Sequence, residues 1–205
     1  STRPNIVVLV ADDAGWDDST AYGNPRIHTP NIQRMADTGI TFTRAFVTSP
    51  QCSPSRASIL SGLYPHQTGA EDLHEPIPPD VTILPTYPRR EGYLTGNMLN
   101  QHIGRAASRQ FDWYSARLGR FEAFVDLAGD RPFFLWVGFM DPHRPYYRGA
   151  VREPHYPGKV RVPAHLADTP GTRLEIARYY DEISRMDAWI GRYLDILEER
   201  GLREN

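Results

Sequence analysis

The chain has 205 residues, of which 40% are hydrophobic and 23% charged, and its formal net charge is −2. This length and balance are those of a folded domain with a sizeable core, and they exclude disordered and fibrous classes. The near-neutral net charge disfavours nucleic-acid binding, and an anionic substrate would have to be bound by local positive groups. No apolar run is long enough to cross a bilayer, and the first residues lack the apolar region of a signal peptide.

The first predicted element is a strand over residues 5–11, a continuous apolar run typical of a parallel strand buried on both faces. Asp12 and Asp13 follow it at once. Ligands bind beyond the carboxyl ends of strands in open α/β sheets, so these carboxylates are candidate ligands for Ca²⁺ or Mg²⁺. Aspartates also end strands as turn formers, and the pattern alone leaves both interpretations open.

The next segments predict a helix and a second strand. Thr29 and Pro30 are helix-start residues and Gly39 is a helix-stop residue, while residues 40–47 are rich in strand formers. The order strand, helix, strand, loop, helix predicts a doubly wound α/β fold with a mostly parallel sheet flanked by helices.

The only cysteine of the chain, Cys52, lies where that second strand leads into another helix. Ser53 is a good N-cap and Pro54 suits the first helical position, so we expect a helix that continues to Leu63. Unpaired N–H groups and the positive end of the helix dipole favour an anion or a thiolate at such a place, and Arg56 adds a fixed charge. An inert core cysteine is the alternative.

A proline-rich loop follows and carries His66 and His74, which have no metal-ligand partner at recognisable spacing. Their assignment stays open between a substrate-binding loop and the ordinary surface. The next helical segment, residues 81–91, contains Pro85 and Pro88, which predict a broken helix.

Two further strands are predicted over residues 92–99 and 131–140, and polar residues follow each of them. The first strand is followed by Asn100 and His102, and the second by His143 and Arg144. His143 thus lies just past the carboxyl end of a strand, where an α/β sheet binds its ligands.

The last part of the chain is predicted to be irregular over residues 146–170 and helical over residues 174–199. The helix has one apolar stripe, formed by Ile176, Tyr179, Tyr180, Ile183, Met186, Ile190, Leu194 and Leu197. Arg178, Arg185 and Arg192 are expected on its solvated side.

The segment Cys52-Ser53-Pro54-Ser55-Arg56 resembles the signature of type I sulfatases, and residues 57–66 are also similar to that family. This resemblance implies that a dedicated maturation enzyme oxidises Cys52 to formylglycine. It also implies an alkaline phosphatase-like fold in which Asp12, Asp13 and the modified Cys52 bind a divalent metal, Ca²⁺ or Mg²⁺.

The resemblance further implies roles for the remaining candidates. Arg56, His102 and His143 correspond to catalytic residues of the family, and Arg144 is a candidate substrate-binding residue. Asn100 occupies the place of a usual lysine, and an amide donates hydrogen bonds but lacks the charge that stabilises an oxyanion. Residues 131–144 look most like heparan N-sulfatases, which remove N-linked sulfate from glucosamine.

The resemblance covers nearly the whole chain, and residues 1–205 are expected to form a sulfatase N-terminal catalytic domain that is incomplete at its C-terminal end. A missing segment or a second chain is expected to complete the metal site. The expected substrate is a sulfated small molecule or glycan, in the periplasm, the lysosome or outside the cell. Two alternatives stay open, a phosphonate or phosphate ester hydrolase and a non-catalytic sulfatase-like binding domain.

Overall fold

The computed structural model describes residues 3–99, 102–146 and 151–204. The chain forms two compact units and passes between them four times. The first, here called the sheet unit, comprises residues 1–10, 45–139 and 197–205. The second, the helix unit, comprises residues 11–44 and 140–196.

The sheet unit contains a parallel four-stranded sheet with the strand order β1-β4-β2-β3. The strands are β1 (Ile6–Val10), β2 (Leu94–Leu99), β3 (Trp113–Ser115) and β4 (Phe133–Gly138). Strands β1, β2 and β4 confirm the three strands predicted over residues 5–11, 92–99 and 131–140. The short edge strand β3 was not predicted, because three residues carry too little periodicity to signal a strand.

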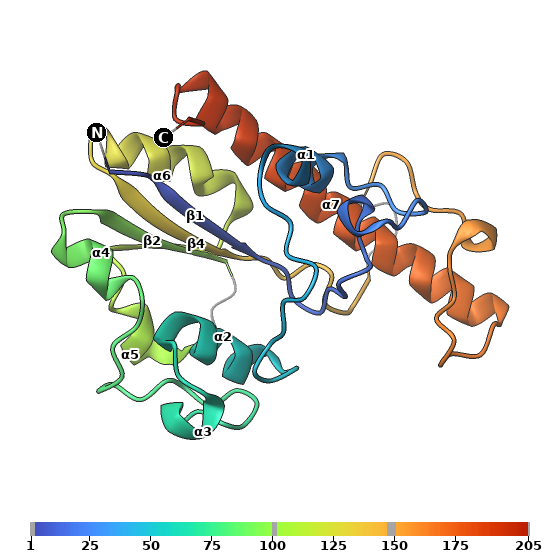
Figure 1. Ribbon diagram of the computed structural model, residues 1–205, viewed down its shortest axis with the longest axis horizontal. Coiled ribbons are helices and arrows are strands. Elements are labelled where there is room, and N and C mark those ends of the chain that lie inside the picture. The colour runs from blue at the N-terminus through green and yellow to red at the C-terminus, as the bar shows by residue number, and fades with distance from the viewer. Residues whose placement is uncertain (1–2, 100–101, 147–150, 205) are drawn as a thin grey trace. The chain divides into compact units, whose positions relative to one another are not determined.

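Helices cover both faces of this sheet (Figure 1). On one face lies α6 (Phe121–Ala128), whose Phe124 packs edge-on against Phe133. Gly96 of β2 allows this contact, because a Cβ atom there would lie 2.4 Å from the Phe124 ring. The other face buries Trp136 in a cluster of apolar side chains from α2 (Cys52–Ser61), α5 (Gly104–Ser108) and the loops between them.

The strand predicted over residues 40–47 is wrong. The segment forms no strand, and Ile40, Phe42 and Phe46 are 83%, 68% and 89% exposed. Its β-branched and aromatic residues favour an extended chain, but a strand also requires a neighbouring backbone with which to form a ladder. None of the described strands pairs with it.

The predicted break in the helix over residues 81–91 is confirmed. Only α4 (Thr86–Arg90) is helical, and it starts directly after Pro85. The remaining short elements are α3 (Pro65–Thr68) and single 3₁₀ turns at Thr20–Tyr22, Leu118–Arg120 and Pro157–Lys159.

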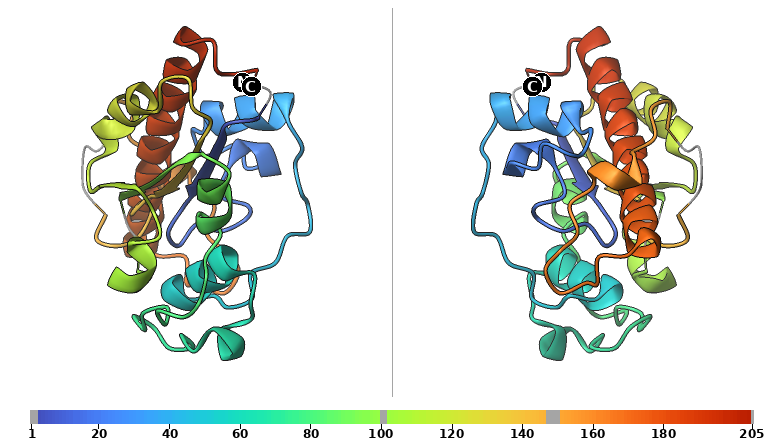
Figure 2. Two further views of the ribbon diagram at one scale, coloured as in Figure 1. Left: turned by 90° about the vertical axis from the view of Figure 1, so that its left-hand side faces the viewer. Right: turned by 90° about the vertical axis from the view of Figure 1, so that its right-hand side faces the viewer.

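The helix unit contains α1 (Pro30–Thr38) and most of α7 (Pro170–Glu199). Both predicted helices are thus confirmed, with α7 starting four residues earlier than expected. Figure 2 shows α7, coloured orange to red, as one continuous helix. Its buried side includes Tyr180, Ile183 and Ile190, as the apolar stripe predicted.

A buried carboxylate of α7 holds the N-terminus of α1. The Asp187 side chain is 1% exposed and accepts hydrogen bonds from the backbone N–H groups of Asn31 and Ile32 at 3.0 and 2.8 Å. It therefore satisfies donors that the first turn of a helix leaves unpaired. Gly191 lets the two helices approach, since a Cβ atom there would lie 2.6 Å from Asn31.

A second buried polar pair joins the irregular segment to α7. His155 Nδ1 lies 2.7 Å from Asp181 Oδ1, and His155 Nε2 accepts the backbone N–H of His28 at 3.3 Å. Nδ1 faces a carboxylate, which accepts, and Nε2 accepts an N–H group. This pattern fits a neutral imidazole with its proton on Nδ1. Burial lowers the pKa of His155, and the neighbouring Asp181 opposes this shift only in part.

Among residues 3–99, 102–146 and 151–204, no helix combines the length and the apolar character needed to cross a bilayer.

We predict that acid destabilises the fold through His155. The unfolded chain, with an ordinary histidine pKa of about 6.5, takes up a proton more readily than the folded one, so stability is lost as pH falls below that value. Thermal melts between pH 7.5 and 5.5 should show a smaller loss in His155→Gln, which keeps neutral donor and acceptor groups. The control His165→Gln, at an exposed position, should lose as much thermal stability over this pH range as the wild type does. An equal dependence of the melting temperature on pH in all three proteins would contradict this role of His155.

Candidate functional site

The sequence-predicted site residues divide between the two units. Cys52, Arg56 and His102 belong to the sheet unit, whereas Asp12, Asp13, His143 and Arg144 belong to the helix unit. Asn100 lies outside the residues that the structure describes.

Cys52 is the first residue of α2, so the helix begins two residues earlier than expected. Gln51, in an extended conformation, is the N-cap residue, and its carbonyl accepts the first helical hydrogen bond from Ser55 at 3.0 Å. The predicted cap, Ser53, is instead buried, and its hydroxyl accepts the backbone N–H of His74 at 2.9 Å. The helix also ends earlier than predicted, at Ser61, because Gly62 adopts the left-handed conformation.

Arg56 follows Cys52 by one helical turn and is only 2% exposed. Residues four apart lie on the same side of a helix, so the guanidinium and the thiol share a face of α2. A buried permanent cation close to a helix N-terminus creates a strongly positive environment. Such an environment suits a tetrahedral oxyanion.

His102 follows β2 and has a positive φ of 42°, a conformation that costs energy for a residue with a side chain. Its ring packs edge-on against the ring of His74 with the centroids 5.2 Å apart. His74 also has a positive φ of 70°. The structure brings His74 next to His102 and Ser53, whereas His66 is exposed and stacks on Tyr64.

In the helix unit, Asp12 and Asp13 have different surroundings. Asp12 is 3% exposed, and its N–H donates to the carbonyl of Asp141 at 3.0 Å. Asp13 is exposed and has a positive φ of 71°. Carboxylate oxygens are the ligands that Ca²⁺ and Mg²⁺ prefer, so the two side chains fit a metal by donor type. They supply fewer oxygens than the six to eight that Ca²⁺ takes.

The His143 ring is oriented by its own loop. Nδ1 lies 2.6 Å from the carbonyl oxygen of Arg144, and a carbonyl can only accept, so Nδ1 carries a proton. Nε2 is the remaining nitrogen and lies 3.8 Å from Asp13 Oδ2. The ring therefore has one fixed donor and one nitrogen that is available for proton exchange beside a carboxylate.

Arg144 is exposed and forms an ion pair with Glu175 of α7, with 2.6 Å between Nη2 and Oε2. Its guanidinium also lies over the ring of Tyr146 at 5.2 Å from the centroid. This pairing leaves Arg144 with a balanced charge rather than as an isolated cation.

The sequence interpretation of Arg185 as a solvated residue is wrong. Arg185 of α7 forms ion pairs with Glu182 and with Asp141, and its Nε donates to Asp141 Oδ2 at 3.1 Å. Asp141 precedes His143 by two residues, so Arg185 fixes the start of the loop that carries His143. No local signal identifies this role, because the partner lies 44 residues away in the sequence.

Known proteins resemble this chain over most of its length. The sulfatase family model matches residues 4–126. Human N-sulphoglucosamine sulphohydrolase is 33% identical over 98% of this chain and 48% of its own length. The chain therefore spans about half the length of this curated relative.

Solved structures confirm the predicted fold class, a doubly wound α/β fold. A structure solved with its substrate D-glucosamine-2-N,6-O-disulfate matches 98% of this chain and 63% of its own, with a TM-score of 0.77 and 18% identity. The phosphonate monoester hydrolase of Agrobacterium radiobacter matches 98% of this chain and 60% of its own, with a TM-score of 0.80 and 18% identity. At this level of identity, both likenesses establish the fold alone.

We predict that His74 shapes the environment of the His102 ring. Removal of the edge-on ring in His74→Ala should move the His102 ring-proton resonances in an NMR spectrum. The control His66→Ala, which changes an exposed histidine of the same loop region, should leave those resonances in place. Unchanged His102 resonances in the folded His74→Ala variant would contradict the contact.

Proposed function

The chain belongs to the sulfatase family, and on this premise we propose that the protein hydrolyses a sulfate ester or sulfamate of a sugar. The observation that carries the proposal is the pairing of Cys52, at the first position of α2, with the buried Arg56 one turn later. A sulfate group is a tetrahedral anion, and this helix end offers N–H groups, a favourable dipole and a fixed positive charge for it.

The proposed substrate is a sulfated amino sugar, as part of a glycan or as a smaller molecule. The name of the human relative refers to N-sulphoglucosamine, and the substrate in the similar solved structure is a disulfated glucosamine. Both names describe those proteins, and they support the same chemical class here.

The proposed nucleophile derives from Cys52. A maturation enzyme of the formylglycine-generating type would use O₂ to oxidise its thiol-bearing carbon to an aldehyde, with the sulfur released as hydrogen sulfide. Water then converts the aldehyde to a geminal diol. One hydroxyl then attacks sulfur and displaces the sugar oxygen or nitrogen, so that a covalent sulfate ester forms. Such covalent catalysis divides one difficult displacement into two easier steps. Arg56 would hold the sulfate oxygens during both.

Two histidines would move the protons. His143 would donate from Nε2 to the leaving oxygen or nitrogen, because Nδ1 is already engaged by the carbonyl of Arg144. Arg185 would act as a positioning residue for this loop through Asp141. His102 would take the proton of the second hydroxyl, so that the aldehyde re-forms and the carbon–oxygen bond to sulfate breaks.

Asp12 and Asp13 would hold a divalent cation, for which we propose Ca²⁺, together with the modified Cys52. A bound cation supplies charge that lowers the pKa of a hydroxyl and neutralises an oxyanion. Because Ca²⁺ takes more oxygens than these side chains offer, we expect further protein or substrate ligands. Arg144 and Asn100 are the proposed substrate-binding residues.

We predict that conversion of Cys52 is required for activity. After expression with a formylglycine-generating enzyme, the intact mass should change by the replacement of CH₂SH with CHO. Cys52→Ala should abolish sulfate release, whereas Ser61→Ala, at the other end of α2, should retain most of it. An unmodified thiol in active protein, retained turnover in Cys52→Ala, or faster cleavage of an aryl phosphate than of the matching sulfate would each contradict the proposal.

We also predict that the amide at position 100 limits the rate. Asn100→Lys adds a positive charge where the family usually has one, and a single oxyanion donor is commonly worth on the order of a hundredfold in rate. We expect kcat/KM for a sulfated sugar to rise at least tenfold. Asn100→Gln keeps an amide without charge, so it should give no comparable gain, and an equal gain in both variants would exclude the charge as the cause.

A further inference from the structure

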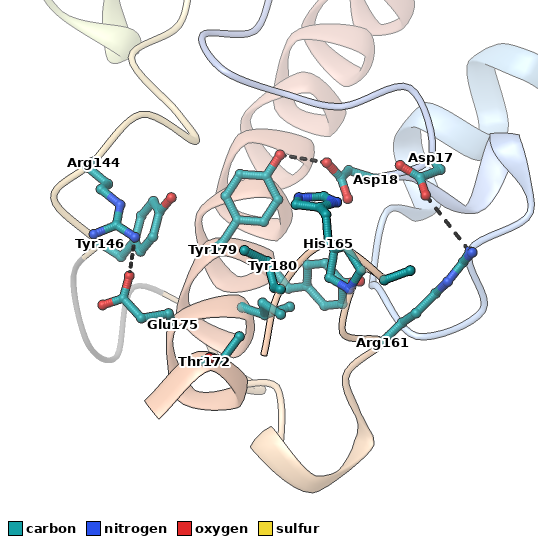
Figure 3. A pocket seen from close by; sticks show the side chains of 14 residues that line it. Asp17, Asp18, Arg144, Tyr146, Arg161, His165, Thr172, Glu175, Tyr179 and Tyr180 are labelled. Atoms are coloured by element: carbon teal, nitrogen blue, oxygen red, sulfur yellow. Dashed lines mark hydrogen bonds and ion pairs between the residues drawn. The ribbon is translucent and has the colours of Figure 1, made fainter. Parts of the chain in front are cut away.

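The helix unit contains a cavity of about 700 Å³. Residues from the Asp17 loop, from the segment around Arg144, from the irregular segment around Arg161 and from α7 line it (Figure 3). This volume lies in the range that holds small organic ligands. Two lining residues, Asp17 and Asp18, follow Asp13 by four and five residues in the chain. Another, Arg144, directly follows His143.

Three tyrosines form a continuous aromatic wall in this cavity. The ring centroids of Tyr146 and Tyr179 are 5.8 Å apart, and those of Tyr179 and Tyr180 are 6.2 Å apart. The Tyr179 hydroxyl lies 2.6 Å from Asp18 Oδ2, which fixes the centre of the wall. Aromatic rings with hydroxyl groups offer both apolar faces and hydrogen bonds, the combination that a sugar ring with its C–H face and hydroxyls can use.

The two sides of the wall carry exposed ion pairs, and Figure 3 shows one on each side of Tyr179. Arg144 faces Glu175 with 2.6 Å between the nearest atoms, and Arg161 faces Asp17 at 3.8 Å. Exposed ion pairs are weak, so their members can turn to sugar hydroxyls at little cost. The charged groups are thus available as hydrogen-bonding partners.

The charge of the lining argues against an anionic ligand. Three carboxylates, those of Asp17, Asp18 and Glu175, line the cavity together with two guanidinium groups. These carboxylate and guanidinium groups together give one net negative charge. This net negative charge disfavours a sulfate or a carboxylate, whereas a hydroxyl or an amine can donate hydrogen bonds to the three carboxylates.

We propose that this cavity binds an unsulfated pyranose unit, uncharged or bearing an amine, that neighbours the sulfated sugar in a glycan substrate. The inference rests on the proposed function and extends it from a single sulfated sugar to at least a disaccharide. The cavity and His143 are linked through Arg144, which follows His143 in the chain and lines the aromatic wall.

The test measures binding of the free-amine disaccharide of glucosamine, which has no sulfate, by calorimetry. Tyr146→Leu keeps an apolar side chain but removes one aromatic face, and we expect binding to weaken at least tenfold. Arg161→Ala changes a residue whose side chain is 68% exposed, so it should fold normally and bind at least threefold more weakly. Tyr114→Leu, on the exposed side of β3, is the matched control and should bind within twofold of the wild type.

A kinetic arm adds the corresponding N-sulfated disaccharide and N-sulfated glucosamine. In Tyr146→Leu, KM should rise at least tenfold for the disaccharide, while KM for the monosaccharide and both kcat values stay within twofold. The inference would be overturned, even in an active enzyme, if the wild type did not bind the unsulfated disaccharide. It would also be overturned if Tyr146→Leu and Arg161→Ala both bound this disaccharide as tightly as the wild type does. Tyr146-dependent binding without any sulfate release would support the cavity as a sugar site and refute the proposed function instead.

Discussion

The parallel ladder of β1, β4 and β2 is the constraint on which the rest of the structure depends. Parallel strands point their carboxyl ends to the same edge of a sheet, and each strand needs a long crossover to return to the other edge. The candidate residues follow the ends of these strands, with Asp12 after β1, His102 after β2 and His143 after β4. The crossovers between these strands carry the helices that bury the two faces of the sheet.

Several loop residues hold backbone conformations that the chain would not adopt alone. Asp13, His74 and His102 all have positive φ angles, each of which costs on the order of 1–3 kcal/mol and persists only where the surroundings enforce it. The surroundings are visible in the contacts: the backbone of His74 is held by Ser53, and its ring packs on His102. Strain of this kind is concentrated at functional sites because it preorganises side chains for binding or catalysis.

The α7 helix shows how one element serves both stability and the site. Its apolar stripe packs as the sequence periodicity indicated, but its buried polar residues take specific partners. Asp187 holds α1, Asp181 holds His155, and Arg185 holds the loop before His143. A buried charge is stable only with such partners, so these residues fix the register of the segments around the helix.

The sequence by itself determined the features that depend on local physics. Strand-forming runs, helix-start residues and proline breaks are properties of neighbouring residues, and they predicted β1, β2, β4, α1 and α7. The Cys52–Arg56 segment predicted the family through its resemblance to the sulfatase signature. Only the tertiary structure decided which distant groups meet. It excluded a strand over residues 40–47, since strand formation needs a partner backbone, and it brought His74 to His102 and Arg185 to Asp141. It also formed the tyrosine-lined cavity, because a cavity arises from how separate segments pack and leaves no periodic trace in any one of them.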